Sequence, residues 1–83
     1  MFYVYILRSK KDDLFYIGYS KDLKNRVELH NNGHVNSTTN RRPLELIYYE
    51  ACLKQSDALR REKYLKSAYG KRYIKNRLKD YLT

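Results

Sequence analysis

Arg26 and His30 lie four residues apart in the stretch "DLKNRVELHNNG" (residues 22–33). On a helix this spacing makes their side chains neighbours one turn apart. The planar guanidinium of arginine suits the oxygens of a phosphate group. His30 has three readings: a hydrogen bond to a phosphate, transfer of a proton, or a satisfied half-buried histidine, and base rates favour the last. A helix face that meets a phosphate is thus one reading of the pair, and a purely structural role for His30 is the other.

Glu62 is the complementary feature. On a helical wheel it falls between apolar side chains that gather on one side of the segment, namely Ala58, Leu59, Leu65 and Tyr69. A carboxylate there would be partly desolvated, which is costly without a partner cation or metal. An ion pair with one of the many arginines is the reading that base rates favour over a functional one.

Tyrosine accounts for ten of the 83 residues. Most should pack in the core or on the sheet with the hydroxyl reaching a polar partner. Tyr3 and Tyr5 share a face of one strand, and Tyr16 lies on the expected partner strand. Two phenols near an arginine and a lone acid favour a phosphoryl-transfer site, because a tyrosine can act as a general base once a cation lowers its pKa from about 10. Gly18 interrupts the second strand, where a glycine marks a bulge or a close backbone approach.

These residues need a scaffold, and hydrophobic periodicity with turn signals predicts one. Ser20 or Asp22 should cap the first helix, and Gly33 should stop it. Ser56 should cap the second helix, and Gly70 should end it. The predicted elements, in chain order, are strands over 2–8 and 14–20, a helix to about 31, a polar basic loop over 33–43, a strand over 44–52, a helix over 57–69 and a last helix over 71–82. The last helix should bury its apolar side chains, namely Ile74, Leu78, Tyr81 and Leu82.

The order ββαβαα predicts an α+β fold, a small three-stranded antiparallel sheet flanked by helices. No internal repeat or linker divides the chain, so we expect residues 1–83 to form a single domain. The hydrophobic fraction of 42% is enough for a compact fold and argues against disorder.

The charge balance points to a partner. Eighteen Lys and Arg against nine Asp and Glu give a net charge of +9, which is expected to attract polyanions, chiefly nucleic acid. A general solubility charge is the alternative, and an anionic membrane surface is less favoured because no basic amphipathic stretch has a broad apolar face. Cys52 is alone, so neither a disulfide framework nor a cysteine zinc site is available. With no apolar run of about 18 residues and no signal-peptide pattern, a cytoplasmic protein is expected.

The motifs together resemble the GIY-YIG nuclease superfamily. They are "YVY" at 3–5, "YIG" at 16–18, Arg26 ten residues after Tyr16, His30 and the later Glu62. The stretches "RRPLELIYYEA" and "ALRREKYLK" are similar in particular to the small stand-alone bacterial proteins of that superfamily. The resemblance covers about residues 2–78.

The resemblance implies a role for each residue. Glu62 would hold a single Mg²⁺ or Mn²⁺, and Tyr5 or Tyr16 would orient or deprotonate the attacking water. Arg26 would neutralise the scissile phosphate, and His30 would contact the phosphate or the base. Gly18 would let the strand pass close to the catalytic tyrosine, which we take as Tyr16. The implied reaction is one-metal hydrolysis of a DNA phosphodiester that leaves 5′-phosphate and 3′-hydroxyl ends.

Three positions depart from the pattern. Tyr3 stands where the first glycine of the motif would be, and Tyr19 stands where some relatives carry a lysine, a role that Lys21 would take. Asn76 is a loose match to a later asparagine. Backbone phosphates would be held by basic residues of the loop and last helix, although a solvated helix face explains the last helix equally well. The candidate DNA-binding residues are Lys21, Arg41, Arg42, Lys71, Arg72, Lys75 and Asn76.

The leading hypothesis is a metal-dependent DNA endonuclease, selective for DNA structure, that acts in repair or recombination without a small-molecule cofactor. Two alternatives remain open. One is a non-catalytic nucleic-acid-binding module. The other is a nuclease module that acts only when a targeting protein delivers it.

Overall fold

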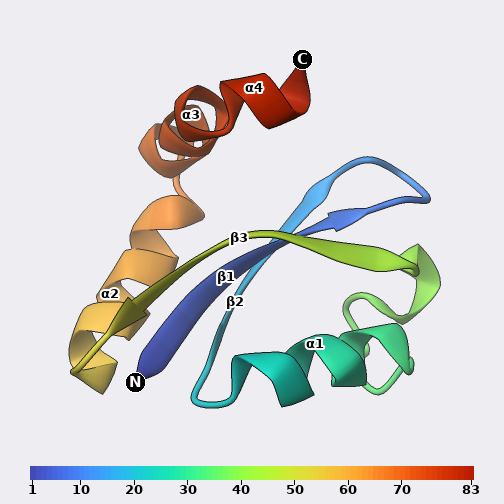
Figure 1. Ribbon diagram of the computed structural model, residues 1–83, viewed down its shortest axis with the longest axis horizontal. Helices are drawn as coiled ribbons and strands as arrows, with labels where there is room; N and C mark the ends of the chain where they lie inside the picture. The colour runs from blue at the N-terminus through green and yellow to red at the C-terminus, as the bar shows by residue number, and fades with distance from the viewer.

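The computed structural model describes residues 1–83 and has an α+β fold built on three antiparallel strands in the order β2-β1-β3 (Figure 1). The ββαβαα order predicted from the sequence is confirmed, with a short helical turn added at the carboxyl end. The elements are β1 (Phe2–Ser9), β2 (Phe15–Ser20), α1 (Leu23–Asn31), the 3₁₀ turn η1 (Thr39–Arg41), β3 (Leu44–Cys52), α2 (Gln55–Leu65), α3 (Ala68–Arg77) and α4 (Lys79–Leu82).

The central strand β1 separates two apolar clusters. Its side chains alternate between the two faces of the sheet, because successive residues of a strand point to opposite sides. Val4 and Ile6 pack with Ala58, Leu65 and Ile74 of α2 and α3. Tyr5 and Leu7 belong to the opposite cluster, which includes side chains of α1. Figure 1 shows the sheet lying between α1 on one side and α2 on the other.

A bulge in β3 lets that strand serve both clusters. Ile6 pairs with Tyr48 and Leu7 pairs with Leu46, so Ile47 is the extra residue between them. Leu46 therefore packs with Tyr5, whereas Ile47 and Tyr48 both pack on the face that α2 covers. The bulge explains why the apolar residues of this strand do not alternate strictly.

The start and end of α1 follow the predicted signals. Asp22 is the N-cap, and its carboxylate accepts a hydrogen bond from the Asn25 backbone N–H at 3.2 Å. Ser20 instead donates its hydroxyl to the Asp22 carbonyl. Gly33 has a φ of +82°, which favours glycine after a helix end. These contacts fix the position from which Arg26 faces the sheet.

The predicted second helix over 57–69 is wrong at both ends. The helix α2 begins at Gln55 and follows Lys54, so Ser56 is not its cap. It ends at Leu65, and Ser67 then caps α3 by accepting from the Gly70 N–H at 3.2 Å. Gly70 lies inside α3, where a Cβ would stand 2.6 Å from the Leu65 carbonyl carbon. This glycine permits close packing of two helices and does not stop one.

The predicted last helix over 71–82 is in fact two segments, α3 and α4, which meet at Leu78. Ile74 is buried as expected. Tyr81 is 44% exposed, and its hydroxyl donates to a Glu45 carboxylate oxygen at 2.6 Å, so the prediction of a buried Tyr81 is wrong. Tyr69 is also exposed, because the break at Ser67 takes it off the helical wheel on which it was placed. Leu59 is exposed as well, although it lies within α2.

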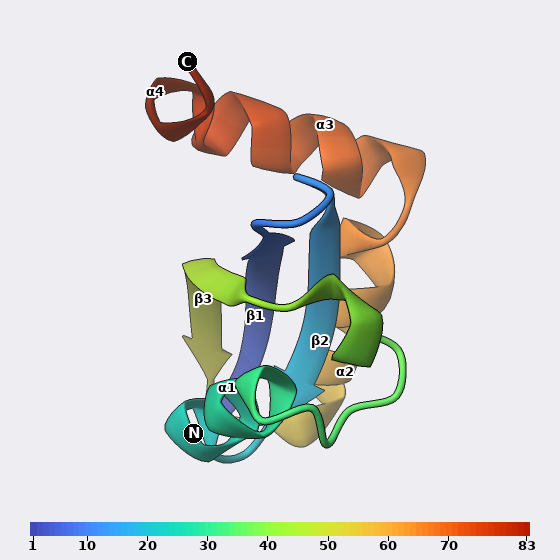
Figure 2. The same ribbon diagram turned by 90° about the vertical axis from the view of Figure 1, so that its right-hand side faces the viewer.

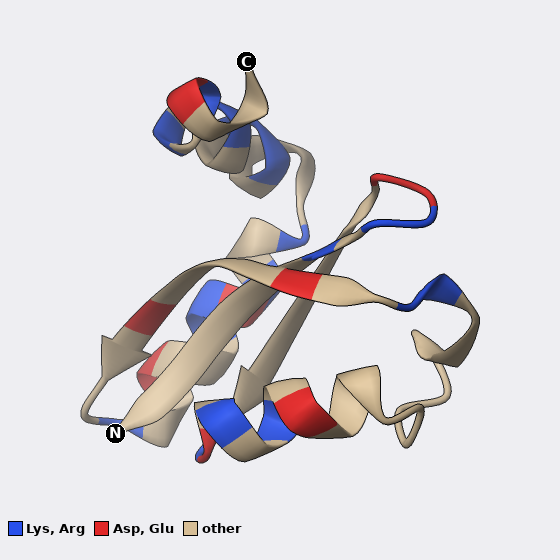
Figure 3. Cartoon of the chain, turned by 45° about the vertical axis from the view of Figure 1, so that its right-hand side comes forward, with Lys and Arg blue, Asp and Glu red and all other residues tan.

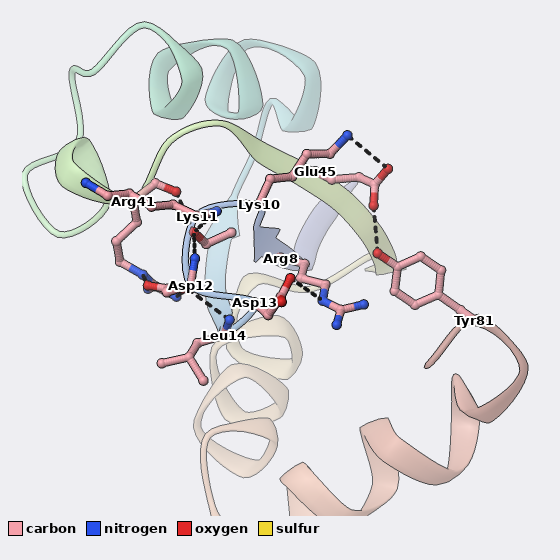
Figure 4. Close-up of polar contacts among 10 residues, drawn as sticks. Arg8, Lys10, Lys11, Asp12, Asp13, Leu14, Arg41, Glu45 and Tyr81 are labelled. Carbon is pink, nitrogen blue, oxygen red and sulfur yellow. Dashed lines mark hydrogen bonds and ion pairs between the residues drawn. The ribbon is translucent and has the colours of Figure 1, made fainter. Parts of the chain in front are cut away.

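The turn between β1 and β2 holds the segment before β3 in place (Figure 4). The buried Ser9 hydroxyl donates to the Arg41 carbonyl at 2.6 Å and accepts from the Lys11 and Asp12 backbone N–H groups. The Arg41 guanidinium forms an ion pair with Asp12 at 2.7 Å. The Arg41 hydrogen bond is the main cause that lowers the pKa of Asp12 to about 2. The loop over 33–43 is therefore tied to the sheet at its far end.

None of the helices has the length and apolarity needed to cross a membrane.

Candidate active site

Tyr5 is the centre of a polar cluster buried beneath α1. Its side chain is 0% exposed, and its phenol oxygen lies 2.8 Å from His30 Nε2. The Arg26 Nε–H donates to the same oxygen at 3.4 Å. The four-residue spacing of Arg26 and His30 turns both toward the sheet, and the strand period turns Tyr5 toward α1.

His30 is fully buried, and both of its ring nitrogens have partners. Nδ1 lies 2.7 Å from the Thr38 hydroxyl, and Nε2 faces Tyr5. Burial, and secondly the charge of Arg26, lowers the pKa of His30 to about 4, so the imidazole is neutral near pH 7. This geometry matches the satisfied buried histidine among the three readings of the sequence. It leaves no ring nitrogen free to meet a phosphate.

The two tyrosines of the motifs differ in access. Burial raises the pKa of Tyr5, and the hydrogen bond from Arg26 does not offset this effect. The Arg26 guanidinium alone therefore does not lower the pKa of the Tyr5 phenol. Tyr16 is only half-buried, and its ring centroid lies 4.9 Å from that of His30 and 6.4 Å from that of Tyr5. Of the two, Tyr16 is the phenol that solvent reaches.

Gly18 makes the close approach that its position in a strand predicted, but toward a different tyrosine. It pairs with Tyr5 across the β1–β2 ladder. The atoms nearest to an added Cβ would be Oη, Cζ and Cε2 of Tyr5, the last at 2.9 Å. The clearance is thus for Tyr5, and the assignment to Tyr16 is wrong, because the Tyr5 ring lies across the strand over the glycine.

Arg26 is partly buried at the edge of this cluster. Its hydrogen bond to Tyr5 is the main cause that raises its pKa, and the charge of the Tyr16 phenol adds to it. Tyr5 occupies the Nε side of the guanidinium. None of the surface pockets is lined by Tyr16, Arg26 or Glu62.

Glu62 is placed on α2 as the helical wheel predicted. It lies one turn from both Ala58 and Leu65, which pack against the sheet, and its side chain is only 19% exposed. Its partner is the Lys66 ammonium at 3.1 Å, a lysine and not the expected arginine. Its charge is the last among the causes that raise the pKa of Tyr5, after burial, so the carboxylate lies within electrostatic reach of that phenol.

The donors at Glu62 fit a weakly coordinated divalent cation. No group of three or more His, Cys, Asp or Glu side chains that could hold a metal ion exists in the chain. A single partly buried carboxylate suits Mg²⁺, which keeps several water ligands and is often bound by one or two carboxylates. The exposed Lys66 side chain would have to move aside.

The candidate DNA-binding residues do not form one surface. Arg41 is held by Asp12, and Arg42 donates to the Thr39 carbonyl at 2.9 Å. Figure 2 shows α3 at one end of the strands and α1 at the other, and Figure 3 shows Lys and Arg spread over α1, η1, the β1–β2 turn and α3. Four of the candidates are exposed on α3, namely Lys71, Arg72, Lys75 and Asn76, and Lys21 lies exposed between β2 and α1.

Thr38 is the site residue that sequence reasoning missed. It is 0% exposed although it lies in a polar loop, "GHVNSTTNRRP". Nothing in that composition distinguishes it from the neighbouring Ser37 and Thr39. Only the fold of the loop beneath α1 brings it to His30.

Comparison with known proteins places this geometry in a family. Residues 1–79 match the GIY-YIG catalytic domain. A UPF0213 protein of Staphylococcus saprophyticus is 39% identical over 74 residues, 88% of this chain and 89% of that one. A UPF0213 protein of Pediococcus acidilactici is 40% identical over 81 residues, 90% and 82% of the two chains.

A solved structure agrees with these matches. The solution structure of the UPF0213 protein BH0048 from Bacillus halodurans is similar with a TM-score of 0.55 and 33% identity, covering 89% of this chain and 82% of that one. The chain described here therefore belongs to the GIY-YIG catalytic domain family, a nuclease family, and within it to the small bacterial UPF0213 proteins.

Proposed function

We propose that this protein is a metal-dependent DNA endonuclease that hydrolyses phosphodiester bonds. The observation that carries the proposal is the hydrogen bond from Arg26 Nε to the buried Tyr5, beside the half-exposed Tyr16. The buried Tyr5 thus anchors the Arg26 cation, which is itself only partly buried. A fixed cation is what stabilises the charge that develops on a phosphate in the transition state.

Arg26 binds the scissile phosphate in this proposal. Its Nε is engaged by Tyr5, so its two terminal nitrogens remain for phosphate oxygens, which match the planar fork of a guanidinium. A guanidinium stays protonated at all relevant pH values.

Tyr16 accepts the proton of the attacking water. Tyr5, with its raised pKa and no exposed atom, has the supporting role of holding Arg26 and His30. Addition of the water oxygen to phosphorus breaks the bond from phosphorus to the 3′ oxygen, which takes a proton from solvent water, so the products carry 5′-phosphate and 3′-hydroxyl ends. The proposal takes Tyr16 as the base from the two tyrosines that the sequence left open.

Glu62 would hold Mg²⁺ or Mn²⁺, with bound water completing the coordination. When bound, the cation supplies positive charge that stabilises the phosphate as it gains negative charge. Lys66 is the partner of this partly buried carboxylate when no metal is bound.

Contacts to DNA would be to backbone phosphates, from Lys21, Lys71, Arg72 and Lys75, with little reading of bases. Selectivity would follow from DNA structure, as required in repair or recombination. A targeting protein would supply the remaining specificity of so small a protein.

A non-catalytic nucleic-acid-binding module is the second candidate. It is favoured by the Lys66 ammonium, which satisfies Glu62 without any metal. The two candidates differ in whether the Glu62 carboxylate is needed for more than folding.

The test uses purified protein with labelled duplex, flap and branched DNA, with and without Mg²⁺ or Mn²⁺. We expect metal-dependent cleavage that is lost in Arg26→Ala and Glu62→Ala while DNA binding persists. Lys24→Ala and Glu28→Ala, two exposed changes on α1, serve as matched controls and should cleave as the unmodified protein does. Binding without cleavage on every substrate, unaltered by Glu62→Ala, would establish the binding module instead. Cleavage that arises only on addition of cell extract would indicate a targeting partner.

A further inference from the structure

Three buried side chains decide which ring nitrogen of His30 carries its proton. Tyr5, His30 and Thr38 are each 0% exposed. Their two contacts, 2.8 Å and 2.7 Å, are short hydrogen bonds on either side of one imidazole. A neutral imidazole has one donor and one acceptor nitrogen, so one of these contacts is donated by the ring and the other is accepted.

The contact with Arg26 fixes which hydrogen bonds the Tyr5 oxygen accepts and which it donates. A guanidinium has no acceptor, so the Tyr5 oxygen must accept the Arg26 Nε–H. The phenol proton then needs an acceptor, and His30 Nε2 is the only other partner of that oxygen. Nε2 therefore bears the lone pair, and Nδ1 bears the proton.

Thr38 completes the same series of hydrogen bonds. Its oxygen accepts the His30 Nδ1–H, and its own hydroxyl donates to the Val35 carbonyl at 3.4 Å. Every donor from Arg26 to Thr38 then has an acceptor, and all four hydrogen bonds run in one direction.

The opposite tautomer breaks this order. A proton on Nε2 would be donated to the Tyr5 oxygen, which would then accept from both His30 and Arg26, and the phenol hydrogen would have no acceptor. A buried donor without an acceptor is strongly disfavoured. The phenol could pair its hydrogen only by turning away from His30 and Arg26.

We propose that Thr38 is a positioning residue for Arg26. By accepting the Nδ1–H of His30 it holds the tautomer that turns a lone pair of Tyr5 toward the guanidinium. The tautomer itself is independent of any reaction, and only its effect on cleavage rests on the function proposed above. The burial of His30 that lowers its pKa keeps the ring neutral, so that a single tautomer can persist near pH 7.

Nitrogen-15 NMR of the histidine rings tests the tautomer directly, because protonated and unprotonated ring nitrogens have well-separated shifts. The chain has two histidines, and His34 is exposed, so it serves as the internal reference. In the unmodified protein we expect His30 Nδ1 to be protonated over Nε2 by roughly tenfold or more. A dominant Nε2–H form would overturn the proposal.

Three variants separate positioning from packing. Thr38→Val keeps the shape and removes the acceptor, so the Nδ1–H form should lose its dominance. Thr38→Ser retains the hydroxyl and should restore it. Thr39→Val, which deletes the hydroxyl that donates to the Gly33 carbonyl in the same loop, should leave the tautomer unchanged. An unchanged tautomer in a folded Thr38→Val would refute the role of Thr38, and dispersed amide spectra establish that each variant is folded.

The activity measurement is separate. If the protein cleaves DNA, we expect Thr38→Val to lower the rate constant roughly tenfold and Thr38→Ser to recover it. Full cleavage by a Thr38→Val protein with an altered tautomer would show that Arg26 is positioned without Thr38. If the unmodified protein does not cleave, the proposed function fails, and the NMR result still decides the tautomer.

Discussion

Gly18 lies opposite Tyr5 in the β1–β2 ladder, and the Tyr5 ring fills the space that a side chain at position 18 would need. This contact sets the direction of the Tyr5 phenol. The ring is pressed between the glycine and α1, so its oxygen meets His30 and Arg26 together. One absent Cβ thus determines the geometry of the buried cluster.

Gly18→Ala should therefore displace Tyr5. The added Cβ would overlap Cζ and Oη of the ring and lie 2.9 Å from Cε2. We expect the free energy of unfolding to fall by about 1–3 kcal/mol, the range for overpacking a core, as measured by denaturant titration.

A double-mutant cycle identifies the cause. Tyr5→Phe should not relieve the Gly18→Ala effect, because Cζ and Cε2 remain, whereas Tyr5→Leu should relieve part of it. Purely additive effects of Gly18→Ala and Tyr5→Leu would mean that the glycine is needed for another reason.

His30 should make stability depend on pH. Its folded-state pKa is lowered from 6.5 to about 4, chiefly by burial, so its contribution is complete above about pH 6.5 and is lost as the pH falls toward 4. The loss should approach about 3 kcal/mol at pH 4. Chemical denaturation of the unmodified protein and of His30→Gln across this pH range measures this loss as the difference between their free energies of unfolding.

The exposed second histidine supplies the control. His34→Gln should retain the pH dependence of the unmodified protein, while His30→Gln should lose the part between pH 6.5 and 4. Equal pH dependence in all three proteins would mean that the imidazole of His30 is not buried as a neutral group.

The strands, the first helix and the shared helix face of Arg26 and His30 could be predicted because their signals are local: a two-residue period, a cap at Ser20 or Asp22 and a four-residue spacing. A site that includes Tyr5 followed only from the family resemblance, because its contact with the helix joins segments far apart in the sequence. The break between α2 and α3 could not, because Ser67 and Gly70 carry ordinary signals whose meaning depends on how two helices pack. The partner of Gly18 and the burial of Thr38 are likewise set by contacts between segments far apart in the sequence.

Gly70→Ala tests that helix contact. Alanine would gain about 1 kcal/mol in helix propensity. A Cβ at this position would meet the Tyr64 carbonyl and the backbone of Leu65, which cannot rotate away as a side chain can. We expect a net loss of about 2 kcal/mol in unfolding free energy. Ala68→Gly, an exposed change in the same helix, should cost no more than about 1 kcal/mol, and a stabilising Gly70→Ala would contradict the packing.

Arg61 joins α2 to β3 and α3 at the edge of the sheet. Its guanidinium donates to both Glu50 carboxylate oxygens, at 2.9 and 3.0 Å, and lies over the rings of Tyr64 and Tyr73. Lysine cannot form the forked contact or stack in the same way. We expect Arg61→Lys to lower the free energy of unfolding by about 1–2 kcal/mol.

The neighbouring Arg60 provides the comparison. Its side chain is 74% exposed and pairs only with Asp57 one turn away, so Arg60→Lys should change stability by less than about 0.5 kcal/mol. Equal effects of Arg60→Lys and Arg61→Lys would mean that the paired carboxylate and the stacked rings contribute nothing measurable.

Lys66 competes with any cation that Glu62 binds. Its ammonium lies 3.1 Å from the carboxylate, and a bound metal ion must displace it. Lys66→Gln removes that competitor. Because exposed ion pairs contribute up to about 1 kcal/mol, Mn²⁺ affinity should rise roughly two- to fivefold. Paramagnetic broadening of amide signals around Glu62 measures the Mn²⁺ affinity without any nuclease assay.

Lys63→Gln is the matched control, since it removes the same charge from the same helix where no ion pair with Glu62 exists. A gain in affinity for Lys66→Gln alone assigns the effect to the displaced partner. An equal gain in both variants would reflect only the lower net charge of the protein, and broadening centred away from Glu62 would place the cation elsewhere.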